Sequence, residues 1–475
     1  MARNRIIYQS EALFISPGST GCCLQESNGG NDSTTDVTWS NITGLEDLTS
    51  NYNLRSLTMP ISRVQNANFN FAINRTDINE FGKLARIDSI AMESPTVGLD
   101  FSYYLTDGGN ERKMGFNIPT NKIASRDSAL YNSSDACYTG VSALSGLIED
   151  NQGNNYLIVT NEDGLDLHSS DKTASSGIFN VIGIGNGFIS DYTVEASVGA
   201  IPTASVTVEA FNMKVDNVIS GAAVNGTYPP TNSSHFAPFV PSVTSAGLYS
   251  TGDGSTPSTA PQFIIQGEED ANSTLAINTT GTDGTPSALR PGDISLEIPN
   301  SNDGIVVTNG DGTAHIQSFT LNVPMSRTVL GRLGNTFGYA RVVDLPLNGE
   351  VTVSTIVSEY NKINLFDKLC HAETLNMTLS LYACNPSTGS AVTGAGAFDV
   401  QFQIKGARLE SQSISNAIGD NQTADLTFSF QIGGANDTNS GLIMNGSYNL
   451  FRCIRSYPLG ENKLSQLAAG ITPST

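Results

Sequence analysis

The sequence predicts an all-β protein with a few short helices, built from two tandem antiparallel β-sandwich or barrel domains and an inserted β/loop region. Three observations support this: short segments alternate between apolar and polar residues, few residues are charged, and a domain-length stretch is repeated. Charged residues make up 15% of the 475 residues, against about 25% in an average globular protein. At roughly 100–200 residues per domain, this length allows two to four domains.

Strict alternation with a period of two residues is typical of strands with one buried and one exposed face. The clearest runs place apolar residues at Phe69, Phe71 and Ile73, at Val97, Leu99, Phe101 and Tyr103, at Val206 and Val208, at Leu321, Val323 and Met325, at Val351 and Val353, at Leu375, Met377, Leu379 and Leu381, at Phe398, Val400, Phe402 and Ile404, and at Leu426, Phe428 and Phe430. Turn signals such as Asp107-Gly108-Gly109-Asn110 separate these runs. The pattern predicts antiparallel sheets.

Helical patterns are few. Apolar residues about three apart predict one amphipathic helix over residues 359–369, which Ser358 can cap. Residues 77–84 are compatible with one or two helical turns, and residues 462–469 with a short terminal helix.

An internal repeat organises the chain. Asn70, Arg75, Thr76 and Gly82 in segment 69–82 recur as Asn322, Arg327, Thr328 and Gly334 in segment 321–334. With a three-residue slip, Ala85-Arg86-Ile87 recurs as Ala340-Arg341-Val342, and segment 186–211 aligns without gaps to 406–431, where Gly199 matches Gly419. The repeated signature is therefore Arg75, Gly82, Arg86, Gly199, Arg327, Gly334, Arg341 and Gly419. A shared structural or inter-subunit role is expected for the arginine pairs, with exposed strand-end cations as the alternative.

The repeat predicts three regions. Residues 1–225 hold the first β-domain, with an N-terminal arm and a long loop at 106–155 that accounts for its extra length. Residues 226–312 form an insert rich in Pro, Ser, Thr and Gly, which is too long for a simple linker and suits a small β subdomain. Residues 313–475 hold the second β-domain and a short C-terminal segment.

The charge excludes several classes of protein. Lys and Arg total 24 and Asp and Glu total 45, for a net charge of −21, which argues against a protein that grips phosphate backbones. No apolar run reaches the 18 or more residues of a membrane span. The N-terminus reaches Gln9 and Glu11 before an apolar signal region can form, so we expect an unprocessed protein that is not secreted.

Motifs for chemistry are missing. Six cysteines and four histidines show no zinc spacing, and no phosphate loop, nucleophile elbow or metalloprotease motif occurs. Gly183-Ile184-Gly185-Asn186-Gly187 resembles part of a dinucleotide loop, but a turn or bulge within a strand explains it better. Asp303-Gly304 and Asp311-Gly312 fit hairpin turns better than a calcium loop. We therefore predict no catalytic residues, no cofactor-binding residues, no metal ligands and no cofactor.

Several segments together resemble one known family. They are the opening Arg-Asn-Arg-Ile-Ile-Tyr-Gln-Ser-Glu-Ala-Leu-Phe, Ile73-Asn74-Arg75-Thr76-Asp77-Ile78, Thr96-Val97-Gly98-Leu99-Asp100-Phe101-Ser102-Tyr103-Tyr104-Leu105, Gly187-Phe188-Ile189-Ser190-Asp191-Tyr192, and Val198-Gly199-Ala200-Ile201-Pro202-Thr203-Ala204-Ser205-Val206. The chain resembles the major tail (tail tube) proteins of tailed bacteriophages, over roughly 64–215 and, more weakly, 315–435.

The resemblance implies a structural virion protein without enzymatic activity. In that family β-domains associate edge to edge into rings, and the rings stack into a tube around the DNA channel. A tandem-domain chain would then form a pseudo-hexameric ring from three copies. The implied partners are other copies of the chain, tail proteins such as the tape measure and tail terminator, and genomic DNA that passes through an acidic lumen without specific binding. No membrane partner is expected, and synthesis would occur in the host cytoplasm.

Two alternatives remain open from the sequence. One is another virion or cell-surface β-protein, such as a capsid-decorating, baseplate or glycan-binding adhesin module. The other is a glycan-active enzyme, although one Trp is a poor basis for a sugar-stacking cleft.

Overall fold

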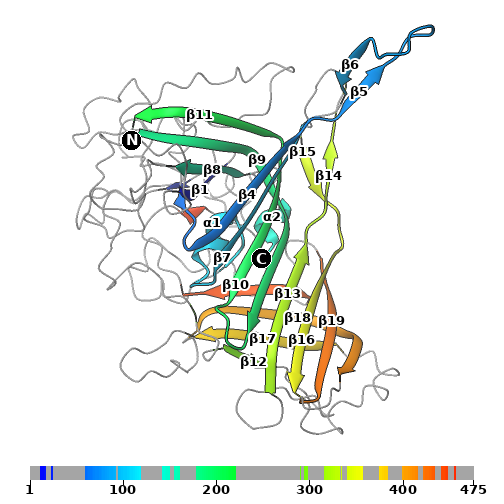
Figure 1. Cartoon of the computed structure of the whole chain (residues 1–475). Coiled ribbons are helices and arrows are strands. Elements are labelled where there is room, and N and C mark those ends of the chain that lie inside the picture. The colour runs from blue at the N-terminus through cyan, green and yellow to red at the C-terminus, as the bar shows by residue number, and fades with distance from the viewer. Residues whose placement is uncertain are drawn as a thin grey trace, which may run out of the picture.

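The computed structural model of the chain is an antiparallel all-β protein with two short helices among the described residues, which confirms the predicted fold class (Figure 1). The described residues are 11–17, 23–24, 59–92, 95–118, 142–149, 154–160, 178–220, 289, 294–297, 315–331, 333, 340–356, 374–382, 398–415, 421–433, 440–447 and 454–455.

Eight strands lie side by side in what we call the front sheet. Their order is β18, β19, β16, β13, β9, β10, β7, β4. The bounds are β4 Val64–Ala72, β7 Thr96–Tyr104, β9 Ile178–Ser197, β10 Thr203–Ala210, β13 His315–Pro324, β16 Leu347–Ile356, β18 Phe398–Ser415 and β19 Thr423–Ile432. Only the second halves of β9 and β18 belong to this sheet, because their first halves pair with other strands.

The first halves of β9 and β18 each pair with further strands to form a second layer behind the front sheet. We call each of these a back layer. In the first half of the chain β9 is flanked by β8 (Asn154–Thr160) and β11 (Asn212–Ser220), and β8 pairs with β1 (Glu11–Pro17), which also pairs with β3 (Met59–Pro60). In the second half β18 is flanked by β17 (Leu375–Tyr382) and β20 (Gly441–Gly446), and β17 pairs with β12 (Ile294–Glu297).

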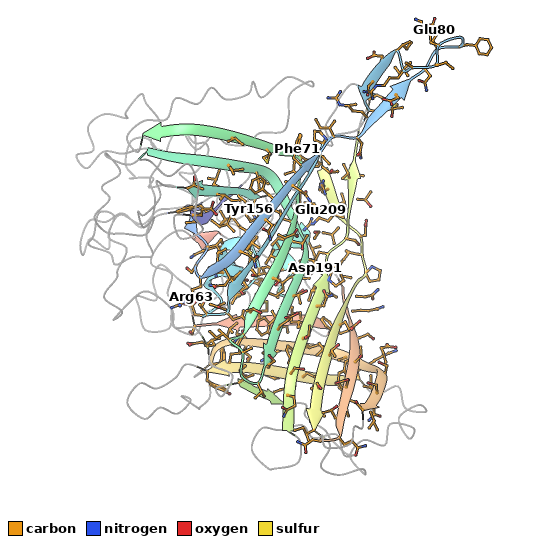
Figure 2. All side chains as sticks on the ribbon, viewed as in Figure 1. Arg63, Phe71, Glu80, Tyr156, Asp191 and Glu209 are labelled. Carbon is orange, nitrogen blue, oxygen red and sulfur yellow. The ribbon has the colours of Figure 1, made fainter. Side chains whose placement is uncertain are left out.

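The remaining elements are small. Two hairpins extend from the front sheet: β5 (Arg75–Ile78) with β6 (Asp88–Ala91), and β14 (Arg327–Leu330) with β15 (Ala340–Val343). The β5–β6 hairpin projects away from the body, with Glu80 near its tip (Figure 2). Two short strands, β2 (Cys23–Leu24) and β21 (Ile454–Arg455), pair with each other, and the helices are α1 (Gly109–Met114) and α2 (Ser145–Glu149).

Strand register shows that the two halves of the chain are built alike. Adding 220 to each residue of the β9–β10 ladder gives the β18–β19 ladder: Ala204 pairs with Val194, and Ala424 pairs with Ile414. Even the bulges coincide, because Ser190 is skipped in the first ladder and its counterpart Glu410 in the second. We call β1 and β4–β11 unit 1, and β12–β20 unit 2.

The earlier strands of the two units are related by a constant shift of 252. Phe69 pairs with Leu99 as Leu321 pairs with Val351, and the same shift relates β5–β6 to β14–β15. The three-residue slip inferred from the sequence is therefore wrong. Arg341 is the structural counterpart of Ser89, and Arg86 lies in the turn between β5 and β6. The sequence alignment matches Ala85-Arg86, which lie in a turn, with Ala340-Arg341, which lie in β15.

The hydrophobic core lies between the front sheet and the back layers. The apolar members of most of the alternating runs point into it, among them Leu99, Phe101, Val206, Leu321 and Phe428, all at most 2% exposed. Burial of such side chains is the main favourable term in folding. The period-two pattern thus predicted the strands and most of the inward-facing residues, whereas Phe69, Phe71 and Ile73 are 40–45% exposed.

Other sequence predictions have mixed outcomes. Residues 77–84 form the end of β5 and a turn, so the helical expectation there is wrong. Gly183 to Gly187 lie within β9, where the pairing with β8 is irregular, which confirms the strand-and-bulge interpretation. Residues 294–297, within the region assigned to the insert, form β12, which pairs with β17 of unit 2. The predicted helices at 359–369 and 462–469 lie outside the described residues.

Candidate assembly interface

The two units meet along a strand-to-strand junction at the centre of the front sheet. β9 of unit 1 pairs with β13 of unit 2 over seven residue pairs, from Ser318 opposite Ser197 to Pro324 opposite Asp191. On the core side the paired residues Leu321 and Val194 are both 0% exposed. The junction is therefore a complete sheet contact, with backbone pairing and a buried apolar seam.

Backbone hydrogen bonds extend this junction at both ends. The Met325 amide donates to the carbonyl of Ser190 at 2.7 Å, and the Val198 amide donates to the carbonyl of Gln317 at 2.9 Å. Both acceptors are the bulge residues skipped by the ladders within the units. Each bulge thus frees a carbonyl that the other unit uses.

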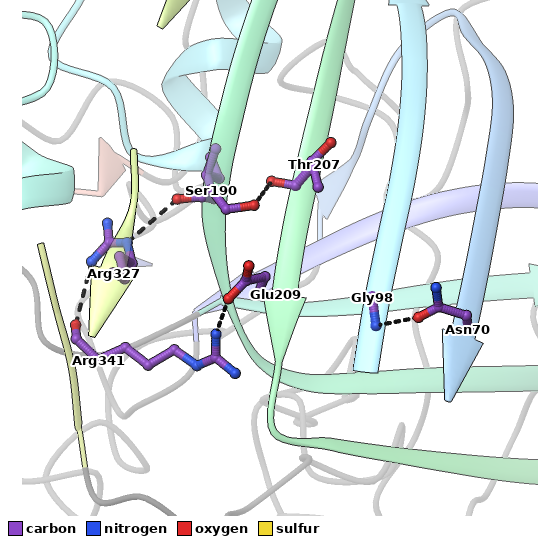
Figure 3. Close-up of polar contacts among 8 residues, drawn as sticks. Asn70, Gly98, Ser190, Thr207, Glu209, Arg327 and Arg341 are labelled. Atoms are coloured by element: carbon purple, nitrogen blue, oxygen red, sulfur yellow. Dashed lines mark hydrogen bonds and ion pairs between the residues drawn. The ribbon is translucent and has the colours of Figure 1, made fainter. Parts of the chain in front are cut away.

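Arg327, at the start of β14, contacts unit 1 through hydrogen bonds and a cation–π interaction (Figure 3). Its guanidinium donates to the carbonyl of Leu147 at 2.9 Å and to that of Ile189 at 3.3 Å. It also lies over the ring of Phe188, 5.1 Å from the centroid. A cation held over an aromatic face and by backbone carbonyls is well satisfied.

Arg341 makes the second connection between the units. It forms an ion pair with Glu209 at the end of β10 (Figure 3). Its guanidinium also stacks over Phe211, 4.6 Å from the ring centroid. The Arg341 side chain is 6% exposed and that of Glu209 52% exposed. Burial lowers the pKa of Arg341, and the Glu209 carboxylate opposes that shift. This ion pair joins unit 1 to unit 2.

The two signature arginines of unit 1, Arg75 and Arg86, are exposed. Arg75 occupies the position of Arg327 in the strand register, and it lies at the start of β5 in the hairpin that extends from the front sheet. Arg86 donates to Asp77 Oδ1 at 2.9 Å within the projecting hairpin. The structure therefore brings Arg327 and Arg341 together at the junction and places Arg75 and Arg86 away from it.

The two signature glycines that the structure describes lie in turns. Gly82 and Gly199 have positive φ angles of 91° and 84°, a conformation that other residues rarely adopt. No atom lies within 4 Å of the Cβ that either position would carry, so turn geometry and not packing favours glycine there. Gly334 and Gly419 lie outside the described residues.

The outward face of the front sheet is polar and acidic. Its carboxylates include Asp100, Asp191, Glu195, Glu350 and Asp425, each alternating with core residues along its strand. Asp191 accepts a hydrogen bond from the Thr193 hydroxyl at 2.9 Å, and partial burial raises its pKa. A face with this charge repels phosphate backbones and does not hold them.

At the rim of unit 1, Asn70 shapes the outermost strand pair. Its Oδ1 accepts a hydrogen bond from the Gly98 amide at 2.9 Å (Figure 3). A Cβ on Gly98 would lie 2.7 Å from that oxygen, so glycine leaves room for the Asn70 side chain. Asn322 is the counterpart of Asn70 in unit 2 and faces Glu350 across its own strand pair.

A buried polar cluster in unit 1 was not found from the sequence. Glu111 of α1 is 1% exposed, and its Oε1 accepts hydrogen bonds from Tyr103 at 2.6 Å and Tyr192 at 3.1 Å. Burial raises the pKa of Glu111, and the two tyrosine hydrogen bonds partly oppose this. Apart from Met114 and Gly109, the short run Gly-Asn-Glu-Arg-Lys-Met is charged or polar, so its pattern does not indicate a buried helix.

Other kinds of site are not evident within the described ranges. No group of three or more His, Cys, Asp or Glu side chains is placed to hold a metal ion there. No helix in the same part of the chain is long and apolar enough to cross a membrane.

No protein-family model matches this chain, and no curated protein matches it. Solved structures with local similarity include the sheath-tube complex of an extracellular contractile injection system (PVC) in its extended state, at 14% identity and a TM-score of 0.21, covering 33% of this chain and 89% of that one. The tube-terminating cap of the anti-feeding prophage shows 10% identity and a TM-score of 0.22, covering 36% and 98%. An Hcp protein shows 10% identity and a TM-score of 0.18, covering 32% and 98%.

Proposed function

We propose that this chain is a structural protein that assembles through the edges of its front sheet into rings, and that the rings stack into the tail tube of a bacteriophage. The observation that carries the proposal is the β9–β13 junction. Two units of one design already associate edge to edge within the chain. The free edge strand of unit 1, β4, corresponds to β13, the strand through which unit 2 contacts unit 1. The free edge of unit 2, the end of β18, corresponds to the end of β9, through which unit 1 makes the same contact.

The number of copies in the ring combines the duplication with the resemblance to tail tube proteins, which implies six units per ring. A contact that joins different edges of identical subunits generates a closed ring if the rotation closes, and a filament if it does not. Six units at equal angles would need three chains, and three front sheets would supply 24 strands. The ring would be trimeric in chains and pseudo-hexameric in units.

The acidic outward face supports a role as a conduit. If the front sheet lines the lumen, Asp100, Glu195 and Glu350 face the channel together with hydroxyl and amide side chains. Phosphate groups would then meet mainly carboxylate, hydroxyl and amide groups, so DNA could slide during ejection. Tape-measure and tail-terminator proteins would be the further partners, and the assembled protein would reside in the virion.

Electron microscopy of the purified chain tests this function. Rings or tubes about 100 Å across are expected from the spacing of six β-units around a channel. A monomer that persists at high protein concentration and binds glycans would instead favour a capsid-decorating, baseplate or adhesin module. Turnover of a glycan that one carboxylate substitution abolishes would favour an enzyme.

A further inference from the structure

We propose that β4 of one copy pairs antiparallel with the end of β18 of the next copy, with Asn68 opposite Ser415, Phe69 opposite Ile414 and Asn70 opposite Ser413. This inference rests on the proposed ring assembly and specifies its contact. The partner is a second copy of this chain. Its docking surface comprises the outer edges of β4 and of residues 411–415.

The register comes from the junction inside the chain. There Thr320 faces Glu195, Leu321 faces Val194, and Asn322 faces Thr193. Subtracting 252 from the β13 residues gives the β4 residues, and adding 220 to the β9 residues gives the β18 residues. The two bulges occupy matching positions, so both edges present the same backbone shape as the strands already joined.

Apolar exposure marks the same two edges. Phe69 is 42% exposed whereas its counterpart Leu321 is 0% exposed, and Ile414 is 46% exposed whereas its counterpart Val194 is 0% exposed. Phe71 and Ile73, at 45% and 40%, have buried counterparts in Val323 and Met325. In the described part of the single chain, no neighbouring strand covers these side chains, whereas the paired strands of the internal junction cover their counterparts.

Unpaired backbone groups point to the same partner. In the part of the chain that the structure describes, β4 pairs with β7 alone, and residues 411–415 pair with β19 alone. Open strand edges of this kind readily accept another strand. By analogy with Met325 and Ser190, the Ile73 amide would donate to the Glu410 carbonyl of the next copy.

Side-chain chemistry distinguishes this contact from the internal junction. The counterparts of Arg341 and Glu209 are Ser89 and Ser429, so the contact between copies lacks the buried ion pair. Glu410 replaces Ser190 and accepts a hydrogen bond from Ser429 within its own unit. The contact between chains would therefore depend on strand pairing and apolar burial, as suits a joint that forms only during assembly.

Cysteine cross-linking of the full chain tests the register. Asn68 and Ser415 are both exposed, and directly opposed residues on paired strands have Cβ atoms about 4.5–5.5 Å apart. The matched control is Asn68→Cys with Ser411→Cys, which shifts one thiol four residues along the same strand, about 13 Å. Each single variant and the unsubstituted chain, which has six cysteines of its own, give the background.

After assembly and mild oxidation, the Asn68→Cys/Ser415→Cys variant should form covalent dimers and trimers at least tenfold more than the control. A second in-register pair, Asn70→Cys with Ser413→Cys, should behave in the same way. Rings that form but cross-link the control pair as well or better would overturn the register and leave the ring assembly standing. Failure of the unsubstituted chain to form rings or tubes would overturn both.

Discussion

The pair Gly349 and Phe430 offers a sharp test of the duplicated architecture. The two residues lie opposite each other on β16 and β19, and a Cβ on Gly349 would lie 2.2 Å from Cζ of the Phe430 ring. Phe430 is 2% exposed, so the ring has little room to move away. At the matching place in unit 1, Val97 lies opposite Ala210. In unit 1 the larger side chain of the pair is therefore on the earlier strand, β7, whereas in unit 2 it is on the later strand, β19.

Gly349→Val should overpack the core of unit 2 and reduce its stability by about 1–3 kcal/mol. Phe430→Ala should remove a buried ring and reduce stability by about 3–5 kcal/mol. The double variant recreates the Val–Ala pair of unit 1, so its loss should be smaller than the sum of the two single losses by about 1–2 kcal/mol or more. The coupling arises because each substitution relieves the defect that the other creates.

Urea unfolding of the four proteins at one protein concentration measures these values. A common concentration matters because assembly stabilises the folded state by mass action. Two results would refute the reasoning: a Gly349→Val variant as stable as the unsubstituted chain, or a double variant whose loss equals the sum of the single losses. Either would mean that the Phe430 ring does not occupy the space above Gly349.

Three further predictions concern the junction, the buried cluster and the edge. Glu209→Gln should cost about 1–3 kcal/mol in urea unfolding, because it leaves the nearly buried Arg341 guanidinium without its carboxylate; an unchanged stability would contradict this. Because burial raises the folded-state pKa of Glu111 above its ordinary value of 4.5, its contribution to stability is complete below pH 4.5 and declines as pH rises through the raised pKa. Stability should therefore fall with pH more steeply in the unsubstituted chain than in Glu111→Gln, and parallel pH profiles would contradict this. Phe69→Asp should leave the circular dichroism spectrum and unfolding midpoint of the single chain unchanged, because the side chain is exposed there. The same substitution should reduce ring assembly, as measured by size-exclusion chromatography. Normal assembly would show that Phe69 is not part of the contact.

Much of the fold could be predicted from the sequence because strand periodicity is a local signal. Val206 and Val208 alternate with polar residues, and both are buried in β10 as that pattern requires. The recurrence of Arg75 and Thr76 as Arg327 and Thr328 likewise corresponds to equal positions in the strand register.

Long-range features could not be predicted in the same way. β9 and β18 each run through both layers, over 20 and 18 residues, and only partner strands define where one layer ends. The match of Arg86 with Arg341 failed because residue identity alone cannot separate a turn from a strand. The contacts of Arg341 with Glu209 and Phe211 join segments more than a hundred residues apart, which the sequence does not indicate.

Electron cryo-microscopy of the assembled protein tests the central claim most directly. We expect rings of three chains, about 150 kDa each given the chain mass of 50.1 kDa, with 24 continuous strands around the channel and β4 paired to β18 of the neighbouring copy. Rings of six chains, or an assembly in which the β4 and β18 edges stay unpaired, would contradict it.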